Sequence, residues 1–128
     1  MTDSTWKNQN IQTSLKNALA GCKYALTTQT NFKVHGLFSI IVILLALWLQ
    51  IPFDHFLFLL IAISIGFTIE MANTVFETTV DLVTEEYNEK ARLAKDISAG
   101  MMLIVSIGLA LTGILILLPP LWQKIFSL

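Results

Sequence analysis

The sequence predicts an all-α membrane protein with an N-terminal amphipathic surface helix followed by three transmembrane helices. The composition is the first reason: 55% of the residues are hydrophobic, 13% are charged and the mean hydropathy is +0.69, far from an ordinary soluble domain. The second reason is that the apolar residues gather in three long blocks. With 128 residues, the chain is predicted to form a single membrane domain over residues 1–128.

Each of the three blocks is long enough to cross a bilayer. The predicted membrane helices are residues 34–51, 53–83 and 97–118. The second follows Pro52, whose fixed φ suits a turn or a first helical position, and its polar-faced end is predicted to extend into the cytoplasm. The third is expected to end before Pro119 and Pro120, because proline does not continue a helix.

Ahead of the first span, about residues 10–30, apolar side chains recur at helical spacing. They are Ile11, Leu15, Ala18, Leu19, Cys22, Ala25 and Leu26. Lys16 and Lys23 lie away from the centre of this stripe. The pattern favours a helix along the inner membrane surface, with its lysines near anionic headgroups, and packing against the bundle is the alternative. The hinge into the membrane is expected at Gln29, Asn31 and Lys33.

The basic residues predict the orientation of the chain. Seven of the eight lie on one side of the predicted spans: Lys7, Lys16, Lys23, Lys33, Lys90, Arg92 and Lys95. Only Lys124 lies on the other side. The positive-inside rule therefore predicts a cytoplasmic N-terminus and a cytoplasmic loop at 82–96. The single cysteine, Cys22, excludes an intrachain disulfide.

A polar row continues directly from the second apolar block. Glu70, Asn73, Glu77 and Asp81 are spaced by three, four and four residues, which places them on one helix face. Carboxylates beside a membrane span are costly, so they suggest a functional site. The alternative is a helix that merely leaves the bilayer, but such exits tend to favour lysine and arginine. On the cytoplasmic side, where ATP and its magnesium are found, the row indicates metal and phosphate chemistry.

The residues before the third span add a second candidate cluster. Lys95 could bridge phosphate oxygens, while Asp96 could hold Lys95 or cap the coming helix. An ordinary charge pair beside the membrane is the alternative. The sequence has no Gly-x-x-x-x-Gly-Lys loop, Gly-x-Gly-x-x-Gly turn or Cys/His cluster, so a nucleotide would be held by other means. No nucleic-acid partner is expected.

Three short helices form a thin bundle with few inward positions. A site with several polar residues is therefore expected to need neighbouring subunits, which predicts a homo-oligomer. A transporter or channel subunit is a rival class, but the other two spans carry no charge at mid-depth. A non-catalytic assembly protein would explain Gly108-x-x-x-Thr112 as close helix packing, but it would not explain Glu70 and Glu77.

Two signatures resemble the small bacterial integral-membrane diacylglycerol kinase and undecaprenol kinase family. They are Glu70-x-x-Asn73-Thr74-x-x-Glu77-x-x-x-Asp81 and the later Glu86-Tyr87 with Ala94-Lys95-Asp96. The likeness continues upstream through Ala18-x-x-Gly21-x-x-Tyr24-Ala25 and Asn31-Phe32-x-x-His35, and covers roughly residues 15–118. The resemblance implies a homotrimer in the bacterial inner membrane, with composite cytoplasmic active sites. It also implies transfer of the γ-phosphate of ATP to a membrane lipid alcohol, with Mg²⁺ as cofactor.

The resemblance also implies roles for individual residues. Glu70 corresponds to the general base that accepts the proton of the lipid hydroxyl, and Glu77 corresponds to a magnesium ligand. The residues implied in ATP binding are Glu77, Glu86, Tyr87, Asn88, Lys95 and Asp96. The substrate-binding or supporting residues are Asn73, Thr74, Asp81, Asn31, Phe32 and His35.

Three positions distinguish this chain within the family pattern. Gln29 stands where the family often has a glutamate of the metal site, so the second metal contact is expected to be weaker or bridged by water. Asn88 stands where many relatives have histidine. His35 resembles the undecaprenol-kinase branch, because the diacylglycerol branch tends to have glutamate there. The predicted substrate is therefore undecaprenol, with diacylglycerol as the alternative.

Overall fold

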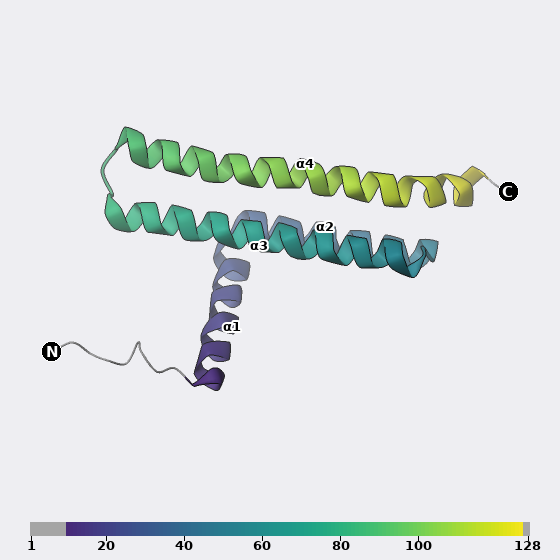
Figure 1. The fold of residues 1–128 in the computed structure, drawn as a ribbon, viewed down its shortest axis with the longest axis horizontal. Coiled ribbons are helices and arrows are strands. Elements are labelled where there is room, and N and C mark those ends of the chain that lie inside the picture. The colour runs from purple at the N-terminus through teal and green to yellow at the C-terminus, as the bar shows by residue number, and fades with distance from the viewer. Residues whose placement is uncertain (1–9, 127–128) are drawn as a thin grey trace.

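The computed structural model describes residues 10–126 and contains four α-helices in that part of the chain. They are α1 (Ile11–Thr28), α2 (Thr30–Leu49), α3 (Phe53–Val83) and α4 (Glu89–Phe126). Figure 1 shows α2, α3 and α4 side by side along one axis, with α1 leaving this bundle at a steep angle. Lys7, which was counted among the basic residues on the cytoplasmic side, lies outside the described residues.

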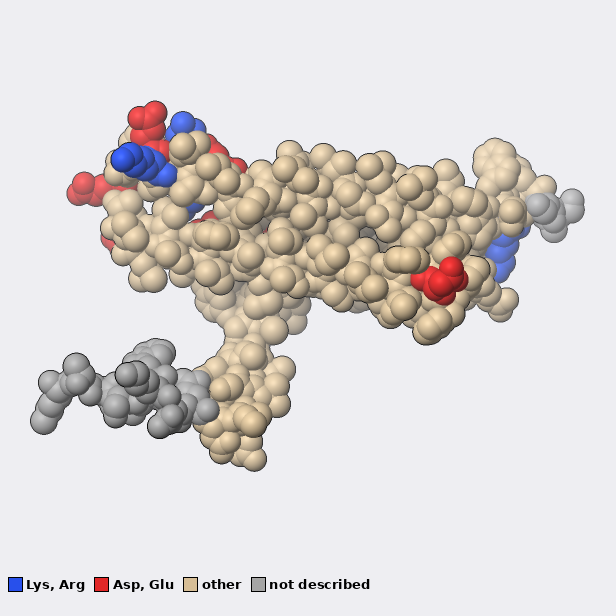
Figure 2. Space-filling view, in the orientation of Figure 1, with Lys and Arg blue, Asp and Glu red and all other residues tan. Residues whose placement is uncertain are grey.

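By length and composition, α2, α3 and α4 are each long and apolar enough to cross a membrane. Figure 2 shows charged side chains gathered at the end of the bundle that carries the α3–α4 connection, called the loop end below. A smaller charged group lies at the opposite end, where α3 has Asp54 in its first turn and α4 has Lys124 in its last. The uncharged surface between these ends is consistent with a membrane protein.

The hinge between α1 and α2 is shorter than predicted. Only Gln29 departs from helical backbone, with φ −90° and ψ 117°, and its N–H still donates to the carbonyl of Ala25 at 2.9 Å. The carbonyl of Gln29 in turn accepts a hydrogen bond from the N–H of Lys33 at 3.3 Å, which starts α2. Asn31 and Lys33 therefore belong to α2, because one extended residue suffices to redirect the chain.

The prediction that the third helix ends before Pro119 is wrong. Helix α4 contains both Pro119 and Pro120 and continues to Phe126. The two prolines lack an N–H, so two carbonyls one turn earlier lose their helical donors. The turn beyond them is tied to α2: Lys124 Nζ donates to the carbonyl of Trp48 at 2.7 Å and lies 4.4 Å from the centroid of the Trp48 ring.

Helix α4 also begins earlier than the predicted span, at Glu89. Its first turn is capped by Asn88, whose Oδ1 accepts hydrogen bonds from the N–H groups of Lys90 at 2.9 Å and Ala91 at 3.3 Å. The suggestion that Asp96 caps this helix is therefore wrong, since Asp96 lies two turns inside it. The loop is short, and the charged residues that follow it project from a helix.

A single chain buries few apolar side chains. In the part of the chain that the structure describes, the buried hydrophobic residues are Ala25, Phe32, Ala46, Leu49, Leu59, Met102 and Leu117. In the most apolar 18-residue stretch of each spanning helix, few residues are buried: 17% in α2, 17% in α3 and 11% in α4. Most of the apolar surface is therefore available to lipid or to other subunits.

Candidate functional site

Buried polar side chains concentrate at the α3–α4 contact, which is the most extensive helix contact in the bundle. In residues 10–126 the buried polar residues are Glu70, Asn73 and Thr74 of α3 and Ser98 of α4. Glu70 is only 1% exposed. A carboxylate buried to this degree requires partners, because the loss of its hydration is otherwise uncompensated.

A hydrogen-bond chain connects α4 to the polar face of α3. Ser98 Oγ donates to Asn73 Oδ1 at 2.6 Å, and Asn73 Nδ2 donates to Glu77 Oε1 at 3.0 Å. Thr74 Oγ1 donates to the backbone carbonyl of Glu70 at 3.1 Å, within α3 itself. The chain from Ser98 to Glu77 therefore fixes a side-chain amide and a carboxylate relative to the backbone of a second helix.

Glu70 has partners on α2 and on its own helix. Asn31 and His35 of α2 and Glu77 of α3 line the same cavity as its carboxyl group and are close enough to interact with it. One oxygen, Oε2, is buried without a hydrogen-bond partner in the described part of the chain. This oxygen has unused capacity to accept a proton or to contact a cation.

A polar cavity of 290 Å³ contains these groups. Its lining combines the start of α2, the middle of α3 and the facing part of α4: Asn31, Val34, His35, Glu70, Asn73, Glu77, Ala99, Met102, Leu103 and Ser106. Five of the residues singled out in the sequence therefore share one cavity. The helical spacing along α3 determines which face the polar residues share, and the packing of α3 against α2 and α4 forms the cavity around them.

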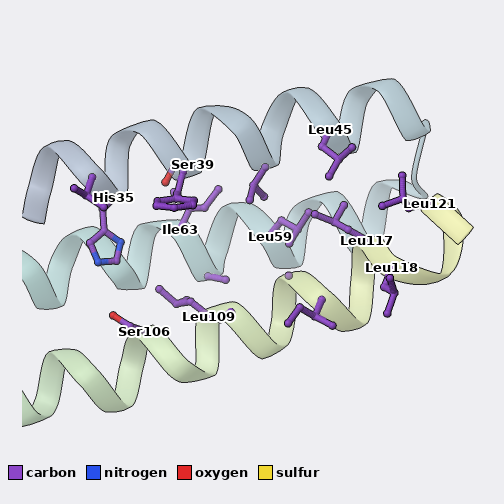
Figure 3. A pocket seen from close by; sticks show the side chains of 17 residues that line it. His35, Ser39, Leu45, Leu59, Ile63, Ser106, Leu109, Leu117, Leu118 and Leu121 are labelled. Atoms are coloured by element: carbon purple, nitrogen blue, oxygen red, sulfur yellow. The ribbon is translucent and has the colours of Figure 1, made fainter.

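A second cavity of 620 Å³ adjoins the first and is lined mainly by apolar side chains. The two cavities have Val34, His35 and Ser106 in common. Figure 3 shows His35 of α2 and Ser106 of α4 at one end of this cavity, and Leu45, Leu117 and Leu121 toward the other. The polar cavity and the apolar cavity are therefore adjacent, with three lining residues in common.

Gly66 of α3 lies beside Leu109, which lines the apolar cavity, and His35, which lines both cavities. A Cβ atom at this position would lie 2.7 Å from Leu109 Cδ1 and 3.7 Å from His35 Nδ1. The missing side chain thus allows α2 and α4 to approach α3 one turn before Glu70. Among the described glycines, Gly66 alone has neighbours this close.

The predicted partnership of Lys95 with Asp96 is wrong. Lys95 Nζ pairs with Asp81 Oδ1 of α3 at 2.5 Å, whereas Asp96 Oδ2 pairs with Arg92 Nη1 at 2.8 Å on α4. The reason is helix geometry, since adjacent residues on α4 face different directions. Both pairs are accessible to solvent, so each contributes little to stability.

The residues predicted at the nucleotide are separated from the carboxylates within one chain. Glu86, Tyr87 and Asn88 line neither cavity and belong to the α3–α4 connection. Tyr87 is 83% exposed, and the backbone of Glu86 exchanges hydrogen bonds with the Thr84 hydroxyl. Asn88 has the structural role of capping α4.

Two predicted residues near the hinge also lie outside the polar cavity. Gln29 Nε2 donates to Thr28 Oγ1 at 3.4 Å, and Gln29 lines neither cavity. Phe32 is buried and its ring packs on Phe67 with centroids 4.9 Å apart, which supports the α2–α3 contact beside His35.

Ser98 and Ser106 are the site residues that the sequence reasoning missed. Both are polar interruptions of the apolar third block, and their spacing of eight residues places them near one face of α4 together with Lys95. The sequence shows this periodicity. It does not show the register of α4 against α3, which determines the residue that each serine contacts.

The two carboxylates of the polar cavity, Glu70 and Glu77, suit a magnesium ion that is also bound by a nucleotide. No group of three or more His, Cys, Asp or Glu side chains that could hold a metal occurs within residues 10–126. Glu70 and Glu77 nevertheless line one cavity, and Glu70 Oε2 has no partner in this region. Mg²⁺ is commonly bound by one or two carboxylates together with substrate phosphates and water, so these residues fit an ion brought with a nucleotide.

The chain matches known proteins over most of its length. A family model for prokaryotic diacylglycerol kinase matches residues 16–117. The chain is 36% identical over 113 residues to a protein named diacylglycerol kinase from a Synechocystis species, covering 88% of this chain but only 65% of that relative. It is 30% identical over 94 residues to the undecaprenol kinase of Bacillus subtilis, covering 73% of this chain and 76% of that relative. It is 25% identical over 97 residues to the diacylglycerol kinase of Escherichia coli K12, covering 76% and 80%. The chain therefore belongs to the prokaryotic diacylglycerol kinase family.

Proposed function

We propose that the protein is a lipid kinase that transfers the γ-phosphate of ATP to the hydroxyl group of a membrane lipid alcohol. The observation that carries this proposal is that two unlike cavities are adjacent and share three lining residues. The polar cavity holds Glu70, whose Oε2 is buried without a partner in the described chain, and the apolar cavity meets it at His35 and Ser106. A lipid alcohol would place its chain in the apolar cavity and its hydroxyl at Glu70.

In this proposal Glu70 is the general base. Its free oxygen accepts the proton of the lipid hydroxyl as the hydroxyl oxygen bonds to the γ-phosphorus and the bond to the ADP oxygen breaks. Glu70 is carried by helix α3, and Asn31 of α2 lies in the same cavity, close enough to interact with the carboxyl group. Thr74 supports the same turn by bonding to the Glu70 carbonyl.

Glu77 is the proposed magnesium ligand, held by Asn73 at 3.0 Å. Bound Mg²⁺ would neutralise charge on the phosphates. Gln29 is proposed as a weaker, neutral second contact, which in a single chain would require its side chain to leave Thr28. Lys95 and Asp96 would contact the nucleotide from α4, with Asp81 holding Lys95 in place.

The proposed ATP site is completed by other subunits. Tyr87 is 83% exposed and lies outside the cavity that holds Glu70, and Glu86 and Asn88 belong to the same short connection. Most of the apolar surface of the spans is unburied in one chain. We therefore propose a homotrimer with composite sites, in which one subunit presents the connection and its neighbour presents Glu70.

We propose undecaprenol as the lipid alcohol, based on the Asn31-Phe32-x-x-His35 segment. His35 lines both cavities, so in this proposal it would contact the alcohol. Phe32 supports this region through Phe67. Diacylglycerol is the second candidate, because the relative at 36% identity bears that name.

The proposed location is the bacterial inner membrane, with the N-terminus and the active site on the cytoplasmic side. The support is the concentration of basic residues at the loop end and ahead of α2, as the positive-inside rule requires. This side also gives the site access to ATP.

The test is phosphoryl transfer by the purified full-length chain in detergent micelles. Undecaprenol and diacylglycerol are offered separately with γ-labelled ATP, with Mg²⁺ or with EDTA. We expect magnesium-dependent labelling of a lipid alcohol, with undecaprenol preferred. A clear preference for diacylglycerol would reverse the substrate assignment, and no labelling of any lipid alcohol would defeat the kinase proposal.

A further inference from the structure

We propose that Ser98 is a positioning residue for Glu77 and acts through the side-chain amide of Asn73. The role of Glu77 as a magnesium ligand rests on the proposed function above. The orientation of Glu77 by Ser98 rests on geometry alone. Ser98 is 2% exposed, Asn73 is 5% exposed, and the two side chains are joined across the α3–α4 contact at 2.6 Å.

The chemistry fixes the direction of every bond in this chain. An ionised carboxylate only accepts hydrogen bonds, so the Asn73 atom 3.0 Å from Glu77 Oε1 is the amide nitrogen. The amide oxygen then faces Ser98, and the serine hydroxyl must donate to it. If the amide flipped, its oxygen would face the carboxylate of Glu77, and two acceptors would repel each other.

Ser98 differs from the hydroxyl-bearing residues of α3 beside the site. Thr74 and Thr78 donate to carbonyls of their own helix, at 3.1 Å and 2.8 Å. Their hydroxyls therefore contact only the backbone of α3 and do not depend on where α4 packs. Ser98 donates to a side chain on another helix, so its bond depends on the placement of α4 against α3.

The same face of α4 carries Lys95, three residues earlier and paired with Asp81 of α3. Ser98 and Lys95 thus connect α4 to α3 on the two sides of Glu77. A hydrogen bond to a neutral amide that itself bonds a carboxylate strengthens that second bond by polarisation. Ser98 therefore stabilises one orientation of Glu77 while leaving its second oxygen for other partners.

The experiment compares Ser98→Ala, which removes the donor, with Ser98→Thr, which keeps it. Ser98→Cys is a third variant of similar volume with a weak donor, and it replaces Ser98→Ala if that protein does not fold. The matched control is Thr112→Ala on the same helix, because the Thr112 hydroxyl donates to the backbone of Gly108 in its own helix at 2.9 Å. All are full-length chains, checked for helix content and oligomer size.

The first measurement is the ¹⁵N–¹H resonance of the Asn73 side-chain amide, assigned by its loss in Asn73→Asp. Ser98→Ala should move this resonance, while Ser98→Thr and Thr112→Ala should leave it near the wild-type position. The second is binding of Mn²⁺ alone, followed by electron paramagnetic resonance. Loss of one buried hydrogen bond should weaken Mn²⁺ binding by about five- to tenfold in Ser98→Ala, with recovery in Ser98→Thr.

In kinetics, Ser98→Ala should raise the Mg²⁺ concentration needed for half-maximal rate more than it lowers kcat. An unchanged Asn73 resonance in folded Ser98→Ala would overturn the proposal. So would a folded Ser98→Thr with the defects of Ser98→Ala, because packing alone would then be responsible. If the wild-type chain phosphorylates no lipid, the proposed function fails, while the amide resonance still decides the role of Ser98.

Discussion

The middle of α3 and the loop end of the bundle are built in opposite ways. Around Glu70, most of the polar groups are buried and hydrogen-bonded in a cavity lined by three helices of one chain, and Glu70 Oε2 is buried without a hydrogen-bond partner in the described residues. At the loop end, the ion pair of Lys95 with Asp81 and the ring of Tyr87 are accessible to solvent. The comparison teaches that one chain gathers the groups of the proposed acceptor site in one cavity, but leaves the proposed nucleotide residues outside that cavity and accessible to solvent. The two halves should therefore respond differently to substitution.

The largest effect is expected from Glu70→Gln. The amide keeps the shape of the side chain but cannot accept the hydroxyl proton, so phosphoryl transfer should fall about 10²- to 10⁴-fold. The measurement is labelled-phosphate transfer at saturating ATP and lipid. Folding and oligomer size should be preserved, because the buried charge of Glu70 is removed without loss of volume. Turnover equal to that of the wild type would exclude Glu70 as the base.

The second prediction concerns the loop end of the bundle. Lys95→Ala removes an accessible ion pair, so stability should change by less than about 1 kcal/mol. If Lys95 contacts phosphates, the KM for ATP should nevertheless rise by about tenfold, the equivalent of one charge-assisted hydrogen bond. Lys90→Ala is the control, since it removes an exposed cation near the start of α4 that is not among the proposed nucleotide contacts. Equal effects of the two substitutions on KM would argue against a specific role for Lys95.

The third prediction concerns the packing of α2 and α4 against α3 one turn before Glu70. Gly66→Val should crowd Leu109 and His35 and destabilise the protein by about 1–3 kcal/mol through overpacking. The KM for the lipid should rise with it, because the junction of the two cavities is narrowed. Thermal unfolding and lipid titration provide the measurements. Gly100→Ala, where an added Cβ has no neighbour within 4 Å, should change neither quantity appreciably.

The smallest effect is expected at the end of the bundle opposite the α3–α4 connection. Lys124→Ala removes the hydrogen bond to the Trp48 carbonyl and the contact with its ring, with a cost of about 1 kcal/mol. The melting temperature should fall by a few degrees, and phosphoryl transfer at a temperature where the protein is folded should be unaffected. Lys90→Ala, at the exposed start of α4, is the comparison. A loss of activity in Lys124→Ala would show that the two ends of the bundle are coupled.

The fold was predictable to the extent that it depends on local length and polarity. Three apolar blocks predict three candidate spans, and the spacing of Glu70, Asn73 and Glu77 predicts their common face because an α-helix repeats every 3.6 residues. The continuation of α4 past Pro119 was not predictable in this way. It accompanies a contact between Lys124 and Trp48, which are far apart in the sequence.

The candidate site was predictable only along α3. Helix pairing decides that Asn73 meets Ser98 and that Asp81 meets Lys95, and a single sequence carries no direct record of that register. The cap at Asn88 was visible in principle, because asparagine is a favoured N-cap residue. The family resemblance implies an ATP-binding role for Asn88, whereas in the structure its side chain caps α4.

The single non-helical residue at Gln29 has a mechanical consequence. Helix α1 has 18 residues and is therefore about 27 Å long, and its direction relative to α2 is decided by the two backbone angles of one residue. A rotation of only 10° at that residue would move the far end of α1 by about 5 Å. The backbone angles of Gln29 therefore determine where the far end of the N-terminal helix lies relative to the bundle.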